Sequence, residues 1–130
     1  MIDNITYEDI IVSHWILFDY DVKDAYAKGP VHYFFEVKNS IHYKSLISGD
    51  YSDYVKLIET TNQKEHSLDL FLQLKNNFSV DTLLEQNNKI ILEYYPILNK
   101  YRVIDGVHRL SILLYNGITE LNSDWFIVKQ

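Results

Sequence analysis

A strand-to-helix junction near the C-terminus carries the residues best suited to chemistry. Residues 101–109, Tyr-Arg-Val-Ile-Asp-Gly-Val-His-Arg, run from a β-prone stretch through Asp105 and Gly106 directly into an apolar helical stretch. The first N–H groups of a helix have no intrahelical acceptor, and this end of a helix carries about half a positive charge. His108 and Arg109 add two side-chain donors in the first turn. The junction therefore predicts an anion site.

The same junction also has a purely structural explanation. Gly106 could serve as an ordinary turn residue, and Arg109 could pair with a nearby acid such as Asp105. A positive charge in the first turn opposes the helix dipole, so a bound anion would explain why Arg109 stands there. The spacing alone leaves both explanations open.

The C-terminal third of the chain contains the elements that must position this junction. Two β-prone runs, Ile90 to Tyr95 and Tyr101 to Ile104, flank a short turn segment and predict a hairpin. The apolar residues from Val107 to Leu114 predict a buried helix that ends at Asn116-Gly117. Trp125 to Val128 predicts a last strand that returns to the sheet.

Helices and strands are also mixed before the hairpin. Cap residues, apolar spacing and the few glycines and prolines mark where each element begins and ends. The predicted elements are a short helix within residues 19–28, a strand over 31–37, a helix over 41–47 between Ser40 and Gly49, an amphipathic helix capped by Ser67, and a shorter helix over 80–86 capped by Ser79. This mixture, with a hairpin in it, predicts an α+β fold with a small mixed sheet and packed helices.

Length and composition limit the function classes. The chain has 130 residues and 47% hydrophobic residues, which is typical of one compact globular domain, residues 1–130. It has no cysteine, and this excludes thiol nucleophiles, Cys-ligated zinc and iron-sulfur clusters. The absence of cysteine is compatible with a cytoplasmic location, which we expect.

The charge and hydropathy patterns disfavour nucleic acid and membrane partners. The formal net charge is -6, whereas affinity for duplex DNA depends largely on neutralising phosphates. The longest apolar stretch, Ile10 to Phe18, is too short to cross a bilayer and follows acidic residues, so it also makes a poor signal peptide.

The residues Asp105-Gly106-Val107-His108-Arg109, after a hairpin and before an apolar helix, resemble the nucleotide-binding signature of the ParB/sulfiredoxin superfamily. The resemblance covers roughly Glu36 to Gly117, and the upstream order of helices and strands also fits it. It implies a ParB/sulfiredoxin-like fold in which this loop and helix start hold nucleotide phosphates. The implied ligand is ATP, ADP or CTP with Mg²⁺. The resemblance does not determine which of these nucleotides is preferred.

Departures from the family pattern separate its activities. Sulfiredoxins carry a catalytic cysteine immediately before the His-Arg pair, where this chain has Val107, so sulfinic acid reduction is excluded. ParB partition proteins carry a following helix-turn-helix domain, for which residues after Gly117 leave no room. The free-serine-kinase-like branch and the small ParB-like proteins associated with surface-polysaccharide biosynthesis remain. The stretch Asn39 to Leu46, with Gly49-Asp50, resembles the latter group.

A kinase also needs a group that receives the proton of the acceptor hydroxyl. The resemblance suggests Glu36, because the kinase branch uses a glutamate from an N-terminal element; a surface carboxylate is the alternative. His42 and Lys44 stand near a predicted helix start and could meet a phosphate or an acidic substrate, or could simply pack and be solvated. Asp50 could help to hold a metal, although an Asp after Gly more often caps a helix.

The remaining histidines give no signal of a site. His14, His32 and His66 have no metal-ligand spacing with one another, and we interpret them as structural. The identity of a metal site and the oligomeric state stay open.

Together these features predict a nucleotide-dependent small-molecule kinase. Its acceptor would be a sugar or amino-acid precursor of a surface glycan, and its partners are the nucleotide and that acceptor. A non-catalytic nucleotide-sensing module is the alternative. A ParB-like nuclease or DNA-binding protein is a third class, which the net charge of -6 disfavours.

Overall fold

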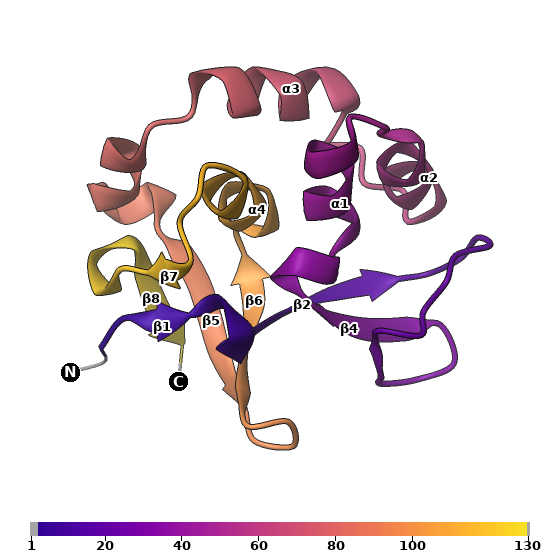
Figure 1. The fold of residues 1–130 in the computed structure, drawn as a ribbon, viewed down its shortest axis with the longest axis horizontal. Helices are drawn as coiled ribbons and strands as arrows, with labels where there is room; N and C mark the ends of the chain where they lie inside the picture. The colour runs from indigo at the N-terminus through magenta and orange to yellow at the C-terminus, as the bar shows by residue number, and fades with distance from the viewer. Residues whose placement is uncertain (1–2, 130) are drawn as a thin grey trace.

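A mixed six-stranded sheet is the centre of the fold in the computed structural model, which describes residues 3–129 (Figure 1). The strand order is β3-β4-β2-β6-β5-β8, and β1 and β7 form a separate two-stranded sheet. The strands are β1 (Ile5–Thr6), β2 (Ile10–Trp15), β3 (Tyr26–Ala27), β4 (His32–Glu36), β5 (Ile90–Tyr95), β6 (Lys100–Asp105), β7 (Glu120–Leu121) and β8 (Phe126–Lys129). The pairs β2–β6 and β5–β8 are parallel, and the other neighbours are antiparallel.

Four α-helices of the described chain lie on one side of this sheet (Figure 1). They are α1 (Ile41–Ser48), α2 (Ser52–Thr60), α3 (Leu68–Asn77) and α4 (Val107–Tyr115). The architecture is therefore a single α+β domain, as the sequence predicted. None of the helices in residues 3–129 has the length and apolar character needed to cross a membrane.

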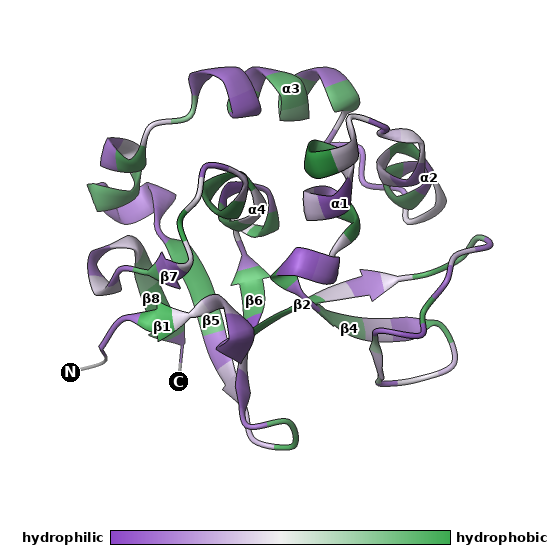
Figure 2. Cartoon of the chain, in the orientation of Figure 1, coloured by the Kyte–Doolittle hydropathy of each residue, from purple (hydrophilic) through white to green (hydrophobic). Residues whose placement is uncertain are grey.

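The core fills the space between the sheet and α4. Ile10, Leu92, Leu110 and Ile112 are fully buried there. Hydrophobic residues are concentrated on β5, on α4 and on the end of β6 nearest α4, at the centre of the molecule (Figure 2). Burial of apolar surface thus fixes α4 over the middle of the sheet, and the start of α4 lies where β6 ends.

Local signals placed most of the helices correctly. Ser40 accepts a hydrogen bond from the N–H of Tyr43 at the start of α1, and Gly49 ends that helix with φ +76°. Ser67 caps α3 in the same way, by accepting from the N–H of Leu70. The predicted β5–β6 hairpin and the last strand are confirmed as well.

The helix predicted within residues 19–28 is wrong. This segment forms turns followed by β3, which pairs with β4. The Asp21 carboxylate accepts a hydrogen bond from the N–H of Lys23 at 3.0 Å, and such local bonds compete with helix formation. Pairing with β4 then satisfies backbone N–H and C=O groups that would otherwise form hydrogen bonds within a short helix.

The central strands β2 and β6 pair over a very short length. Their ladder joins Ile10 with Tyr101 and Ile11 with Arg102, after which the two strands diverge (Figure 1). Beyond this point β2 continues along β4, whereas β6 continues along β5. The carboxyl ends of two parallel strands therefore separate beneath the helices.

Candidate functional site

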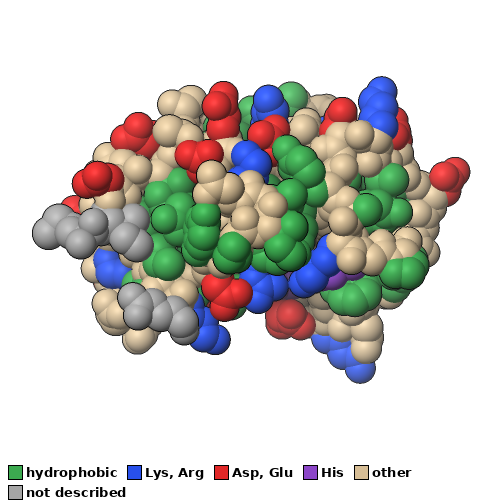
Figure 3. Space-filling model, turned by 90° about the horizontal axis from the view of Figure 1, so that it is seen from below, with side chains coloured by type: hydrophobic (Ala, Val, Ile, Leu, Met, Phe, Trp, Pro, Cys, Tyr) green, Lys and Arg blue, Asp and Glu red, His purple; other side chains and the backbone are tan. Residues whose placement is uncertain are grey.

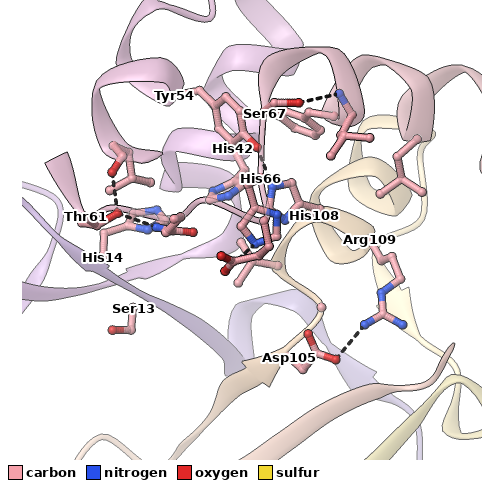
Figure 4. Close-up of a pocket in the computed structure, with 18 of the residues that line it drawn as sticks. Ser13, His14, His42, Tyr54, Thr61, His66, Ser67, Asp105, His108 and Arg109 are labelled. Carbon is pink, nitrogen blue, oxygen red and sulfur yellow. Dashed lines mark hydrogen bonds and ion pairs between the residues drawn. The ribbon is translucent and has the colours of Figure 1, made fainter. Parts of the chain in front are cut away.

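A cavity of about 490 Å³ opens where β2 and β6 diverge. Its walls come from the end of β2, from α1, α2 and α3, from the segment 61–67, and from residues 104–109 at the junction of β6 with α4 (Figure 4). Its size is in the range of small-ligand sites. In open sheets, ligands bind beyond the carboxyl ends of the strands, which is the position of this cavity.

The predicted junction residues Asp105, Gly106, Val107, His108 and Arg109 all line this cavity. Gly106 has φ +115°, a backbone conformation that side-chain-bearing residues rarely adopt. A Cβ added to Gly106 would also lie 3.0 Å from Cγ1 of Ile90. A glycine is therefore required here to turn the chain from β6 into α4 against β5.

Arg109 has protein partners at the edge of the cavity. Its Nη2 lies 3.2 Å from Oδ2 of Asp105, and its Nη1 donates to the carbonyl oxygen of Asn88. This is the pairing that the structural explanation of the junction predicted. The Asp105 carboxylate is largely exposed, whereas the Arg109 side chain is 18% exposed; Figure 4 shows the ion pair between them.

Four histidines from distant parts of the chain meet above the junction (Figure 4). The ring centroids of His14 and His42 are 5.4 Å apart, those of His42 and His108 are 4.5 Å apart, and those of His66 and His108 are 4.4 Å apart. We refer to His14, His42, His66 and His108 as the histidine cluster. All four line the cavity.

Burial keeps most of the histidine cluster neutral. It lowers the pKa of His14 to about 4 and that of His108 to about 3, and it holds the pKa of His42 well below its usual value. The neighbouring imidazoles add to the lowering for His42 and His108. At neutral pH these rings therefore act as uncharged donors and acceptors of hydrogen bonds.

Two of the rings have defined hydrogen bonds. Nε2 of His14 accepts from the N–H of Ile41 at 3.2 Å, which places the ring hydrogen of a neutral His14 on Nδ1. Nε2 of His108 is hydrogen-bonded to the phenol oxygen of Tyr54 at 2.8 Å. These bonds fix the orientation of both rings.

His42 differs from its neighbours. It is 5% exposed, and among the described residues its Nδ1 has no hydrogen-bond partner. A buried polar atom without a partner is costly, typically by about 1–3 kcal/mol. His42 also lines the cavity, but its Nδ1 is itself buried.

The other predicted site residues lie elsewhere. Glu36, at the end of β4, lines a second cavity of about 360 Å³ with Tyr7 and Thr119, and its carboxylate is 3.7 Å from Nζ of Lys38. Lys44 is exposed on α1 and does not line the first cavity. His42 is thus the only one of the predicted catalytic or substrate-binding residues that the described chain brings to the junction.

Asp50 makes local hydrogen bonds just before α2, whose N-cap residue is Tyr51. Its Oδ1 accepts from the N–H of Ser52 at 3.0 Å and from the Ser52 hydroxyl at 2.8 Å, at the start of α2. These hydrogen bonds lower the pKa of the Asp50 carboxyl. Asp50 is exposed, and its hydrogen bonds to Ser52 stabilise the turn before α2.

Sequence reasoning missed His14, His66 and Tyr54 as cavity residues. His14 lies on β2 and His66 on the segment before α3, and no sequence spacing relates either of them to His108. Only the fold brings them together. His32, by contrast, lies outside the cluster, where it bonds to the Ser13 hydroxyl and stacks on Trp15.

The cavity has no preformed metal centre. Within residues 3–129 no group of three or more histidines and carboxylates is arranged to hold a metal ion. Two carboxylate residues, Glu65 and Asp105, line the cavity. Mg²⁺ commonly binds through one or two carboxylates together with the phosphates of a substrate, so these residues fit an ion that arrives with a nucleotide.

Comparisons with protein-family models, with curated proteins and with solved structures give no significant match for this chain. The site is therefore interpreted from its own residues and geometry.

Proposed function

We propose that the cavity binds ATP, ADP or CTP with Mg²⁺, its phosphates lying at the start of α4, and that the chain is a small-molecule kinase. The position of this helix start carries the proposal, because Gly106, Val107, His108 and Arg109 all line a cavity large enough for a small ligand. The first N–H groups of α4 have no intrahelical acceptor and suit a phosphate oxygen. Mg²⁺ would neutralise charge on the transferred phosphoryl group.

Arg109 is the proposed side-chain contact to the phosphates. Its present partner, Asp105, is mostly exposed, whereas the Arg109 side chain is only 18% exposed. A phosphate offers charge-assisted hydrogen bonds in a bidentate geometry that suits a guanidinium group. A phosphate oxygen could replace the Asp105 carboxylate as the partner of Nη2, while Nη1 keeps its hydrogen bond to Asn88.

His42 replaces Glu36 as the proposed contact to the acceptor. Its side chain lines the cavity, its Nδ1 is buried without a hydrogen-bond partner within residues 3–129, and burial holds the ring neutral. In the proposed reaction the acceptor hydroxyl oxygen forms a bond to the terminal phosphorus, and the bond from that phosphorus to the bridging oxygen breaks. The hydroxyl proton passes to deprotonated Nδ1 of His42.

The ParB/sulfiredoxin-like fold and the role in surface-glycan synthesis belong to the same proposal. They are supported by the Asp105-Gly106-Val107-His108-Arg109 signature and by the hairpin that precedes it. The acceptor would then be a sugar or amino-acid precursor, and the reaction would take place in the cytoplasm.

A nucleotide-sensing module is the second candidate. One observation favours it: Glu36 lines a different cavity and Asp50 is hydrogen-bonded to Ser52, so neither carboxylate lies at the proposed phosphate site. In a sensor, the same junction would bind nucleotide and alter the affinity for a partner without turnover.

Calorimetry with Mg²⁺ and ADP, ATP or CTP tests the phosphate assignment. Arg109→Ala should weaken nucleotide binding about 10- to 150-fold, the size of a lost charge-assisted hydrogen bond. Arg102→Ala is the matched control, because Arg102 pairs with Glu93 at 2.7 Å and does not line the cavity. Equal affinity in folded wild type and Arg109→Ala would refute the assignment.

A product screen separates the kinase from the sensor. Sugars, amino acids and nucleosides are incubated with nucleotide and Mg²⁺, and phosphorylated product is detected by ³¹P NMR. His42→Asn should slow transfer by about 10² to 10⁴ with nearly unchanged nucleotide affinity, whereas Glu36→Gln should act on transfer only if its cavity takes part. Tight nucleotide binding without any product would favour the sensor.

A further inference from the structure

Trp15 is an exposed aromatic residue in the wall of the cavity. It is the last residue of β2, and 52% of its surface is accessible. Tryptophan is a highly buried residue on average, so such exposure needs a reason. An exposed indole beside a cavity offers a large apolar face to a planar ligand.

The indole ring is held in place by its neighbour across the sheet. Trp15 pairs with His32 on β4, and the two rings stack with centroids 4.3 Å apart and planes inclined by 12°. His32 is itself hydrogen-bonded to the hydroxyl of Ser13. The ring is thus supported on one side before any ligand arrives, which reduces the conformational entropy lost on binding.

Trp15 and the start of α4 line the same cavity. Strands β2 and β6 are parallel, and Ile10 is the register partner of Tyr101. The ladder ends at Ile11 and Arg102, and Trp15 and Gly106 each follow four residues later. The strands diverge between these points, so Trp15 and Gly106 lie on two walls of the same cavity.

We propose that Trp15 is the stacking platform for the base of the nucleotide whose phosphates lie at Gly106 and Arg109. This inference rests on the proposed nucleotide binding and adds the residue that receives the base. Every nucleobase has a π-face, so stacking binds several bases, and specificity among them is then modest. Stacking on an aromatic side chain accounts for about 5- to 150-fold in affinity.

The first test compares a ligand that has a base with one that does not. The Kd values of ADP and of pyrophosphate are measured by calorimetry with Mg²⁺ for the wild type, Trp15→Ala and Trp15→Phe. The wild type should bind ADP more tightly than pyrophosphate by about 5- to 150-fold. Trp15→Ala should bind the two ligands equally and keep the wild-type affinity for pyrophosphate. Trp15→Phe should retain most of the preference for ADP. Leu17→Ala is the control, since Leu17 is equally exposed nearby but does not line the cavity.

A second readout does not depend on Trp15→Ala being folded. The chain has two tryptophans, so Trp125→Phe leaves Trp15 as the only indole. ADP should quench the fluorescence of this variant, and pyrophosphate should not. Quenching by neither ligand at saturation would refute the platform.

The outcomes separate this inference from the function it extends. Equal affinity of the wild type for ADP and pyrophosphate would remove the base site and leave the phosphate site intact. A parallel loss of both affinities in a folded Trp15→Ala variant would make Trp15 a structural residue. Binding of neither ligand by the wild type would overturn nucleotide binding, and the platform with it.

Discussion

The phenol oxygen of Tyr54 and Nε2 of His108 are hydrogen-bonded at 2.8 Å across the interface between α2 and the start of α4. Tyr54 is fully buried, and burial raises its pKa to about 12, so the phenol stays protonated. The bond ties the orientation of the His108 ring, and with it the histidine cluster, to the packing of α2.

Removing this bond should destabilise the protein. Tyr54→Phe leaves Nε2 of the half-buried His108 without its partner, so we expect the free energy of unfolding to fall by about 1–3 kcal/mol. Urea denaturation followed by circular dichroism measures the change. Tyr115→Phe, at an exposed position on α4, is the control and should stay within about 0.5 kcal/mol of the wild type. Equal stabilities of Tyr54→Phe and wild type would show that the hydrogen bond contributes nothing.

Gly106→Ala should be more harmful than other glycine substitutions. The new Cβ would stand 3.0 Å from the Ile90 side chain and would require φ +115°, so we expect a loss of about 2–4 kcal/mol from strain and overpacking. Gly49→Ala shares a positive φ, +76°, but has no atom within 4 Å, and should cost about 1 kcal/mol. Thermal or urea unfolding of both variants gives the ranking. A milder effect at Gly106 than at Gly49 would contradict the packing against Ile90.

Asp105→Asn tests whether Asp105 competes with a phosphate for Arg109. The substitution removes a negative charge beside the proposed phosphate site, so ADP binding in the absence of Mg²⁺ should tighten about 2- to 10-fold. The free energy of unfolding should change by less than about 0.5 kcal/mol, because the ion pair is exposed on the carboxylate side. Weaker ADP binding without Mg²⁺ would instead make the Asp105 side chain a direct ligand contact.

Acid should destabilise the fold through the buried histidines. The pKa values of His14 and His108 in the folded state are about 4 and 3, below the usual value of 6.5, so the unfolded chain binds more protons between pH 6.5 and these values. Stability is therefore full above pH 6.5 and falls as the pH is lowered toward 4. We expect a loss of about 2–5 kcal/mol over this range, measured by urea denaturation at each pH. His14→Phe should show a shallower decline, and a flat profile between pH 6.5 and 5 in the wild type would contradict the buried neutral state.

The net negative charge of the protein disfavours binding to duplex DNA. Lys and Arg side chains are interspersed with Asp, Glu and hydrophobic groups on the face seen from below (Figure 3). With a net charge of -6, this protein should release few counterions from duplex DNA. Filter binding or fluorescence anisotropy at about 0.15 M salt should therefore detect no micromolar affinity for random duplex, and such affinity would revive the DNA-binding alternative.

Features that depend on a few adjacent residues were predictable from the sequence. Ser40 and Gly49 bound α1 because a hydroxyl cap and a left-handed glycine act within one helical turn. The junction at Asp105-Gly106 was recognisable for the same reason, since a strand, a glycine and an apolar helix follow one another directly.

Features that depend on distant pairing were not predictable. Tyr26 and Ala27 form a strand only because Phe34 and Tyr33 lie beside them, and their local sequence favours turns. Likewise His14 reaches His42 and His108 only after β2 has entered the centre of the sheet. The same limit applies to Glu36, whose position at a strand end is compatible with several cavities until the helices are placed.

Because β2 and β6 pair over only two residues each, the cavity lies between two parts of the chain. On one side lie β2, β3 and β4 from the N-terminal third, and on the other lie β5, β6 and β8 from the C-terminal third. Within the sheet these two parts are joined only through Ile10–Ile11 and Tyr101–Arg102 in the described structure, while α1 packs on α4 above them. Pairing β2 with β6 requires segments from opposite ends of the chain to meet, and such long-range pairing is intrinsically slow. A ligand that contacts both walls would stabilise the association of the two parts. The backbone amides of β2 and β6 should then exchange their hydrogens more slowly when the ligand is bound.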